Sequence, residues 1–561
     1  MTKTSPKTWV MACVLVAALL ALLLPLGACA STGSGGTAET TYTLDGATCF
    51  TFSDDSIVAE EGSYSGYKID GTALTINDAG TYAVSGSCAD GSITIKKGTT
   101  GVTLVLNGLI LTSSDTAPIA CSKSTEVTIV AADGTVNTLT DAAENNDDSY
   151  PDNENAENAV IKCKDGSVVT LCGTGTLNIN ANGKNGIKSG ATTDEEGEAS
   201  LTIRDLTLNL SVPVNDAVNA EQLLNVESGT LTISAADDAL HCDLVMNIGA
   251  DGTAGPTIDI TECYEGIEAA TLNIFSGDIS INSSDDCLNA ANGDLTGYSF
   301  SMTISGGSIY AYASSGDGFD SNGDLTISGG TVVVWTANTA DNQPLDADGT
   351  LTVSGGTVLA AGGSSGMGVR TSAAQPYVTF GSTGGMGGFR AQGGASSLLP
   401  KGTAFTITDA DGSTVCSGTA VCNANYVFFS SPDLSESESC TLSAAGTTVG
   451  TAAAQAGTTS GGFSGGMGGQ RPDGTADGTT PPERPDGAAD GTTPPALPDG
   501  QTPPDGQEPP EGITPPEDFD GAQPPTLPDG AQPPAKPDNG QPPRGADSPV
   551  KPDEAQTTAA A

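Results

Sequence analysis

The chain has 561 residues, a formal net charge of −49 and an aromatic content of only 4%. A surface this acidic repels nucleic acid and anionic membranes, which leaves metal cations and neutral or cation-bridged ligands as candidate partners. Because large apolar anchors are scarce and glycines number 74, we expect stability to come from many thin, stacked layers.

The first 28 residues have the pattern of a lipoprotein signal peptide. Lys3 and Lys7 precede an apolar run that is short for a membrane span, and Leu26-Gly27-Ala28 stands immediately before Cys29. This segment resembles the bacterial lipobox, so we expect lipidation of Cys29 and anchoring to the bacterial membrane on the cell surface. An ordinary secretory signal is the alternative. Residues 29–41 then form a flexible tether.

Short strands follow from residue 42, separated by Gly and Asp turns, as in Ala73–Ile76 and Val102–Leu106. No apolar pattern of helical length is present, so this segment belongs to an all-β structure. Residues 141–157 carry a run of acidic side chains. Charge runs of this kind are usually solvated, and we expect a mobile loop here.

A short repeat organises the rest of the chain and is clearest between Thr261 and Ala360. Each copy has a polar or acidic residue, a turn, one apolar marker residue, a second polar residue and then a strand. Copies this small cannot bury an apolar side alone, so they must stack. Their Thr, Ile and Val content and period-two alternation favour a parallel β-solenoid over helical repeats. The markers are Ile119, Ile161, Ile187, Val218, Leu240, Ile267, Leu288, Phe319, Leu345 and Val369.

The cysteines give a simple test of this register. Cys121 and Cys163 each follow a marker by two residues, so they should lie one above the other. We favour buried thiols that act as small apolar residues over a disulfide. The chain has one histidine and no CxxC pair, so a zinc site is not predicted.

Stacking also collects carboxylates into columns, because neighbouring strands lie ~4.8 Å apart. Like charges at ~5 Å repel by about 3 kcal/mol at an effective dielectric near 20. Ca²⁺, which takes about six to eight oxygen ligands, would relieve this repulsion. The alternative is that these are turn aspartates that bond their own backbone. The candidate metal ligands are Asp216, Asp238, Glu265, Glu268, Asp285, Asp286, Asp317 and Asp320.

After Val369 the repeat register decays, and the remaining sequence divides by composition. We predict a β-helix over residues 42–371 and a Gly-rich loop with a small β cap over residues 372–450. Residues 451–561 are rich in Pro, Gly and Asp, cannot bury a core, and are predicted to form a disordered acidic tail.

Several motifs resemble a family of secreted bacterial carbohydrate-binding domain proteins, over roughly residues 42–450. The resemblance implies a right-handed parallel β-helix, similar in shape to pectate lyases, that binds calcium, cellulose and acidic polysaccharides without established catalysis. Two rungs depart from the pattern, because Ala217 and Ala239 stand where a mid-motif glycine is expected. The motifs are Thr135–Asp141, Gly173–Leu177, Asn185–Ser189, Tyr264–Glu268, Asp285–Ala290, Gly316–Ser321 and Ser430–Leu434.

These observations predict calcium-dependent, non-catalytic binding of an extracellular polysaccharide, either cellulose or a pectin-like polymer. Lys188 is a candidate sugar contact, and Tyr264, Tyr310 and Tyr312 are candidates for stacking on sugar rings, with core packing as the alternative for each tyrosine. Paired acids such as Asp237-Asp238 suggest a lyase or glycoside hydrolase acting on uronate-containing glycans instead. The recurrence of the pattern argues against that, since an active site is built once. A structural surface adhesin is the third alternative.

Overall fold

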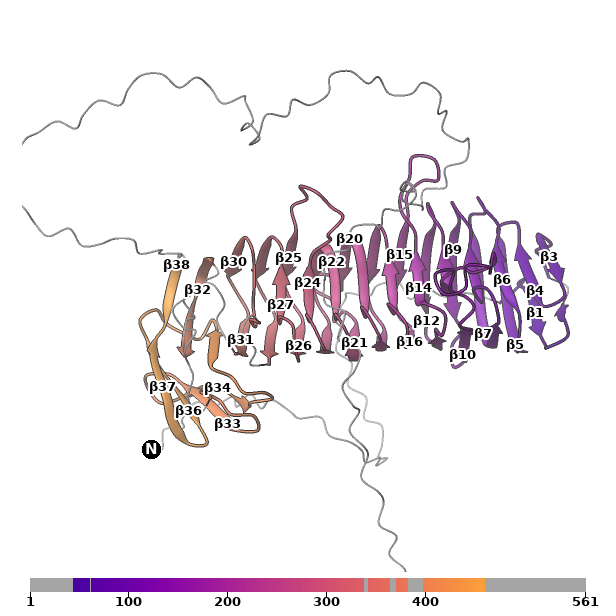
Figure 1. Cartoon of the computed structure of the whole chain (residues 1–561). Coiled ribbons are helices and arrows are strands. Elements are labelled where there is room, and N and C mark those ends of the chain that lie inside the picture. The colour runs from indigo at the N-terminus through magenta and orange to yellow at the C-terminus, as the bar shows by residue number, and fades with distance from the viewer. Residues whose placement is uncertain (1–43, 61, 338–341, 364–369, 382–396, 460–561) are drawn as a thin grey trace, which may run out of the picture. The chain divides into compact units, whose positions relative to one another are not determined.

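Short strands and tight turns wind the chain into a parallel β-helix whose rungs follow one another in sequence order (Figure 1). The computed structural model describes residues 44–60, 62–337, 342–363, 370–381 and 397–459. The lipidation site Cys29, the marker Val369 and most of the predicted tail lie outside these ranges. Among the described residues, no helix is long and apolar enough to cross a membrane.

The first face of the β-helix, here called the marker face, contains the strands with the repeat markers. These strands are short and pair in parallel from rung to rung. They are β4 (Ala73–Ile76), β6 (Ser92–Ile95), β8 (Ile119–Cys121), β11 (Ala159–Cys163), β14 (Asn185–Ser189), β17 (Val218–Ala220), the first parts of β20 (Leu240–Ile248) and β22 (Ile267–Ile274), β24 (Leu288–Ala290) and β27 (Phe319–Ser321).

The second face follows each marker strand after a turn, and in β20 and β22 it continues the same strand past a register shift. Only the first parts of β5 and β7 and the second parts of β20 and β22 belong to this face. Its strands are β1 (Thr48–Phe52), β5 (Gly80–Cys88), β7 (Val102–Ser113), β9 (Glu126–Ala131), β12 (Val168–Gly173), β15 (Ser200–Ile203), β18 (Leu223–Val226), β25 (Ser301–Ile304), β28 (Asp324–Ile327), β30 (Thr350–Val353) and β32 (Arg370–Gly381).

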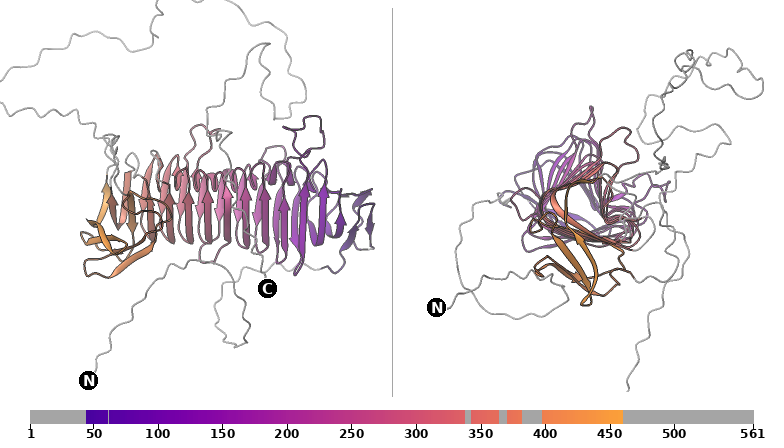
Figure 2. Two further views of the ribbon diagram at one scale, coloured as in Figure 1. Left: turned by 60° about the horizontal axis from the view of Figure 1, so that its bottom comes forward. Right: turned by 90° about the vertical axis from the view of Figure 1, so that its left-hand side faces the viewer.

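The third face closes each rung and leads into the next marker strand (Figure 2). Its strands also continue from the second parts of β5 and β7. They are β10 (Val136–Asp141), β13 (Thr176–Asn180), β16 (Thr207–Val212), β19 (Thr230–Ala235), β21 (Thr257–Cys263), β23 (Asp278–Ser283), β26 (Ser308–Ala313), β29 (Thr331–Thr336) and β31 (Thr357–Gly362).

The predicted register is confirmed from Ile119 to Leu345, because every marker in this range is the direct partner of the next. The column also extends upstream to Ile93 and Leu74, which the sequence reading did not include. Every one of these side chains is buried in the core. The inward apolar residue at the marker position therefore keeps the rungs of the marker face in register.

Two expectations about local structure have clear outcomes. Cys121 and Cys163 are in-register partners and fully buried thiols, as predicted. Ala217 and Ala239 do not alter their turns: the Ala217 N–H donates to the Asp238 carbonyl at 2.9 Å, and the Gly266 N–H donates to the Asp286 carbonyl at the same distance.

The prediction of a mobile acidic loop after β10 is wrong for its first residues. Asp141 is only 1% exposed, and its carboxylate accepts hydrogen bonds from Asn145 Nδ2 at 2.8 Å and from the Asn182 N–H at 2.6 Å. Asn145 is also buried and donates to the Ala159 carbonyl at 3.0 Å. The loop is tied down because its polar side chains replace the backbone bonds that a strand would make.

Both ends of the stack are covered by antiparallel strands. At the N-terminal end, β2 (Ile57–Ala59) pairs with β1 and β3 (Tyr67–Asp70) pairs with β4. At the C-terminal end, β35 (Tyr426–Ser430) pairs with β31 and β32, and β38 (Gln455–Thr459) pairs with β32. The remaining strands, β33 (Ala404–Thr408), β34 (Thr414–Thr419), β36 (Ser439–Ala444) and β37 (Thr447–Ala453), form a separate four-stranded sheet.

The C-terminal cap corrects one predicted boundary. Strand β38 reaches Thr459, whereas the sequence reading begins the disordered tail at residue 451. The segment has only small and polar side chains, but its backbone pairs with β32 and so completes the edge of the sheet. The cap packs on the helix through Trp335 and Phe405, whose ring centroids lie 5.9 Å apart.

Candidate functional site

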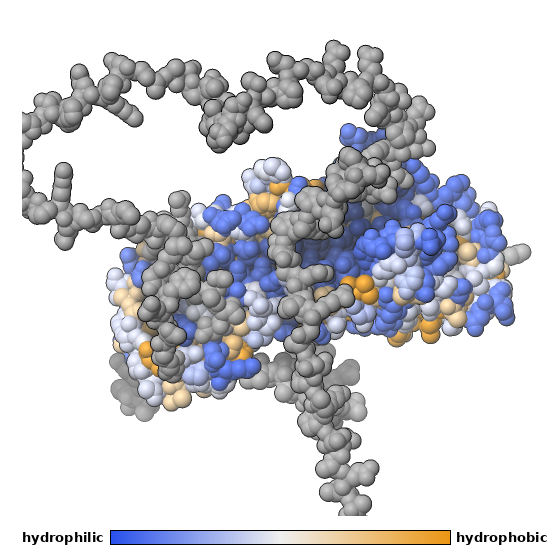
Figure 3. All heavy atoms as spheres, in the orientation of Figure 1, coloured by the Kyte–Doolittle hydropathy of each residue, from blue (hydrophilic) through white to orange (hydrophobic). Residues whose placement is uncertain are grey.

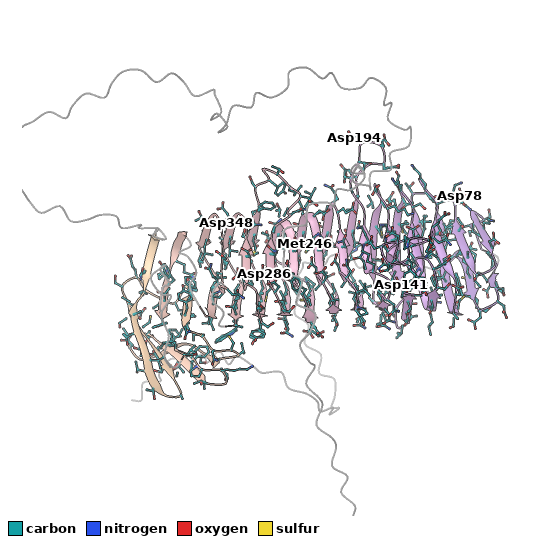
Figure 4. The ribbon with its side chains drawn as sticks, viewed as in Figure 1. Asp78, Asp141, Asp194, Met246, Asp286 and Asp348 are labelled. Carbon is teal, nitrogen blue, oxygen red and sulfur yellow. The ribbon has the colours of Figure 1, made fainter. Side chains whose placement is uncertain are left out.

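Acidic side chains form a continuous column where the third face turns into the marker face. Each lies just before or just after a marker, so stacking of the rungs brings them together. Figure 4 labels Asp286, which lies in this column between β23 and β24. We call the set the acidic ladder: Asp216, Asp238, Glu265, Asp286 and Asp317 two residues before the markers, and Glu268, Asp320 and Asp346 one residue after them.

Within a rung, the two positions that flank the marker point to the same side and bond to each other. Asn219 Nδ2 donates to Asp216 Oδ2 at 2.6 Å, and Gln343 Nε2 donates to Asp346 Oδ2 at 2.8 Å. Burial raises the pKa of Glu268, and the neighbouring carboxyl group of Glu265 adds to this rise.

Between rungs, ladder carboxylates accept backbone N–H groups from the next turn. The Asp317 N–H donates to Asp286 Oδ1 at 2.6 Å, and the Gln343 N–H donates to the Asp317 carboxylate. The alternative of backbone-bonded turn aspartates is therefore partly right: the bonds of Asp286 and Asp317 run to the next rung, whereas Asp346 accepts the N–H of Ala347 in its own turn at 2.8 Å. Each such bond uses one oxygen and leaves the second available to a ligand.

Burial makes the ladder a poor place for unscreened negative charge. It raises the pKa of Glu268 to about 10 and that of Asp286 to about 9. Burial also raises the pKa of Asp317 to about 7, and the neighbouring charges of Asp320 and Asp346 add to this rise. Glu268 and Asp286 therefore hold protons at neutral pH unless a cation binds.

The histidine of the chain lies in the ladder and supplies a positive charge. His241 Nδ1 lies 2.8 Å from Asp238 Oδ2, and His241 Nε2 lies 3.0 Å from Asp243 Oδ1. Burial opposes a charge on the ring, but these two hydrogen bonds outweigh it and raise the pKa of His241 to about 12. Both ring N–H groups of the imidazolium therefore donate to carboxylates.

In the part of the chain that the structure describes, three groups of ligand atoms lie close enough to hold a metal ion, with all atoms of a group within 4.8 Å of one another. Two are entirely carboxylate, which is the donor set that Ca²⁺ prefers. The third includes His241, whose nitrogens are already bonded to carboxylates. The groups are Asp216, Asp237 and Asp238; Asp317, Asp320 and Asp346; and Asp238, His241 and Glu268.

Five of the eight predicted metal ligands belong to these groups, while Glu265 and Asp286 lie in the ladder between them. Asp285 lies apart and bonds to Tyr264, whose pKa is raised first by burial and then by this contact. Asp237 and Asp346 were missed as ligands. Asp346 follows the marker Leu345 by one residue, so its column position was a usable signal.

The predicted sugar contacts separate into different environments. Tyr310 is 42% exposed on the third face, but Tyr312 on the same strand packs against the apolar cluster of the cap. The two therefore do not form a shared stacking platform. Lys188 Nζ is held by Glu221 Oε1 at 3.3 Å. The outer surface around these faces is mostly hydrophilic (Figure 3).

The model of the carbohydrate-binding domain-containing protein family matches residues 70–366. The chain belongs to this family. The matched residues contain the whole acidic ladder, and the resemblance seen in the sequence motifs is confirmed. The acidic ladder therefore lies within the part of the β-helix that the family model matches.

Two individual comparisons accompany the family match. A carbohydrate-binding domain-containing protein of Acetivibrio thermocellus is 34% identical over 137 residues, which is 24% of this chain and 46% of that protein. The chain thus spans about half the length of this family member. A solved structure, described as a polysaccharide lyase-like protein from C. thermocellum in a gadolinium derivative, has 22% identity and a TM-score of 0.28, with 56% of this chain and 93% of that chain covered.

Proposed function

We propose that this carbohydrate-binding protein holds an extracellular polysaccharide, cellulose or a pectin-like polymer, without catalysis and in a calcium-dependent manner. The observation that carries the proposal is the acidic ladder, in which carboxylates from successive rungs come within 4.8 Å of one another. Such proximity is unfavourable unless a cation binds, and it recurs along the stack at the spacing of the rungs.

Calcium fits the donor chemistry of the two all-carboxylate groups. Asp317, Asp320 and Asp346 would hold one ion, and Asp216, Asp237 and Asp238 would hold a second. A bound Ca²⁺ supplies positive charge and coordination positions that protein oxygens leave open, which hydroxyl or carboxylate groups of a glycan can fill. The two groups would hold these ions at different rungs of the β-helix.

Several contacts support a non-catalytic role. A lyase needs a base that can take a proton, and Lys188 is engaged by Glu221. His241 donates to carboxylates through both ring nitrogens and is held in its charged form. A group that already carries its proton cannot accept one at neutral pH. The metal groups also occur more than once, unlike a single active site.

Location at the cell surface follows from the N-terminal segment and belongs to the same proposal. A lipid on Cys29 would tether the β-helix to the bacterial membrane, and the tether of residues 29–41 would let the ladder reach polymers outside the cell. The membrane would then be contacted through the lipid.

A sedimentation assay tests this proposal. The full chain is mixed with insoluble cellulose or with covalently crosslinked pectin, which stays insoluble without calcium, in calcium and in EDTA, and the protein left in solution is measured. We expect depletion in calcium and recovery in EDTA. Soluble polygalacturonate is followed in parallel by ultraviolet absorbance, which should stay constant. Unsaturated product would contradict the non-catalytic role, and equal depletion in both buffers would contradict the calcium dependence.

A further inference from the structure

The residues one position after the markers form a row on the outer side of the marker face, and this row changes sign along the stack. Its first charged members are lysines and its last are carboxylates. Every neighbour pair from Lys162 to Asp320 is in direct register. The row reads Lys162, Lys188, Asn219, His241, Glu268, Asn289, Asp320 and Asp346.

Lys162 is a member of this row that forms no hydrogen bond or ion pair among the described residues, although its side chain is half-buried. Its neighbour Lys188 bonds to Glu221 at 3.3 Å, and Lys164 bonds to Glu157 at 2.7 Å. Burial and the nearby charge of Lys188 lower the pKa of Lys162, while the charges of Glu221 and Glu157 oppose this shift.

This arrangement is unfavourable by itself. Like charges directly opposite on neighbouring strands repel, and an ammonium group taken partly out of water costs free energy unless an anion accompanies it. The chain has a net charge of −49, yet both nearby glutamates are already bonded to other lysines. The surroundings of Lys162 therefore have room for one more negative charge.

We propose that Lys162, with Lys188 and Lys164 beside it, forms an anion subsite for a carboxylate group of an acidic polysaccharide. The proposal rests on polysaccharide binding as the function and adds the class of polymer, one with uronate residues. Glu268 lies three rungs beyond Lys188, or ~14 Å at the usual strand spacing. One polymer could thus meet ammonium groups directly and the ladder through calcium.

The two ends of this row would bind the same kind of group by different chemistry. At the lysine end, a carboxylate pairs with an ammonium group and needs no metal. At the ladder end, a carboxylate meets a surface that is itself acidic, so a divalent cation must lie between. Chelation should therefore remove one set of contacts and leave the other.

Calorimetric titration of the full chain with a soluble oligogalacturonate tests the subsite. Lys162→Met keeps the length and apolar stem of the side chain but removes its charge. Lys68→Met removes the same charge from the exposed strand β3, where Lys68 pairs with Asp70, and serves as the matched control. Lys162→Met removes a charge-assisted contact to the carboxylate, so it should weaken binding by roughly tenfold or more.

The weakening should be present in calcium and in EDTA, and it should be absent for a methyl-esterified oligogalacturonate, which has no free carboxylate. Lys162→Gln, which retains a polar side chain, should show the same loss. Lys68→Met should bind like the unmodified chain. Thermal melts of all variants check that the β-helix is intact.

The outcomes separate the subsite from the calcium ladder. Equal affinity of Lys162→Met and the unmodified chain for oligogalacturonate would overturn the subsite even where binding needs calcium. Lysine-dependent binding that persists unchanged in EDTA would support the subsite while contradicting the role of calcium. An absence of binding in both buffers would overturn both.

Discussion

Glu268 and Asp286 show how the environment of one side chain determines what the site can bind. Their pKa values are raised to about 10 and about 9, mainly because burial disfavours the ionised form. A bound divalent cation reverses this preference, since it stabilises the ionised carboxylate more than the protonated one. Calcium and protons should therefore compete for these groups.

This competition predicts how stability depends on pH. Without metal, the folded state keeps protons on Glu268 and Asp286 above pH ~4, where the unfolded chain has lost them. The free energy of unfolding should then fall as pH rises from about 4 to about 10. Thermal melts in EDTA check this slope, which Glu268→Gln should reduce and saturating calcium should remove. A melting temperature in EDTA that rises over this range would contradict it.

Asp320 gives a second test at the level of one residue. Burial raises its pKa to about 6, and Asp346 and Asp348 add repulsion, so it is charged at pH 8. Asp320→Asn should stabilise the metal-free chain by about 1 kcal/mol through relief of this repulsion. The same change should weaken calcium affinity by about tenfold, since it removes a charged ligand.

Melting in EDTA and calorimetric titration with calcium measure the two effects of Asp320→Asn. Asp251→Asn, in an exposed turn, is the matched control and should change neither. A loss of stability in both buffers would indicate that Asp320 is simply a structural turn residue.

At the scale of one rung, the residue before each marker sets how closely neighbouring turns approach. An added Cβ at Gly266 would lie 2.2 Å from the carbonyl oxygen of Cys287. Ala217 and Ala239 are accepted at the equivalent position and are fully buried. The turns that contain these alanines therefore accommodate a methyl group and keep the hydrogen bonds between rungs.

Gly266→Ala should consequently destabilise the chain by about 2 kcal/mol, in the range for overpacked interiors. It should also weaken calcium binding, because the turn that carries Glu265 and Glu268 must shift. Gly293→Ala is the matched control, since an added Cβ there meets nothing within 4 Å. Chemical denaturation measures both variants, and equal stability of the two would refute the close contact.

The sequence predicts the marker strands well because each needs one inward apolar residue, and this requirement leaves a visible spacing. The second and third faces were not separated, because strands such as β12 and β13 share the same period-two pattern. The acidic loop was misread because charge alone does not show that Asp141 accepts a hydrogen bond from Asn182 or that Asn145 donates to the Ala159 carbonyl. Those bonds depend on residues far along the chain.

Over the whole molecule, stacking places residues at equivalent repeat positions in columns on the surface. The columns of the candidate site could therefore be predicted together with the fold. The ligand groups could not be predicted completely. Asp237 and Asp346 complete groups only through contacts across turns, and Tyr312 is covered by a cap that is distant in sequence. Likewise, the structure was needed to show that the described residues form no ion pair with Lys162, because the nearby glutamates pair with Lys164 and Lys188.

Thermal unfolding of the full chain, with saturating calcium and after exhaustive chelation, tests the central claim most directly when metal content is measured on the same samples. If cations bind between the ladder carboxylates, calcium at 100 times its dissociation constant should add about 2.7 kcal/mol per site to the free energy of unfolding. The melting temperature should then rise with calcium concentration. An identical melting temperature after chelation, with no metal retained by the untreated chain, would contradict the claim.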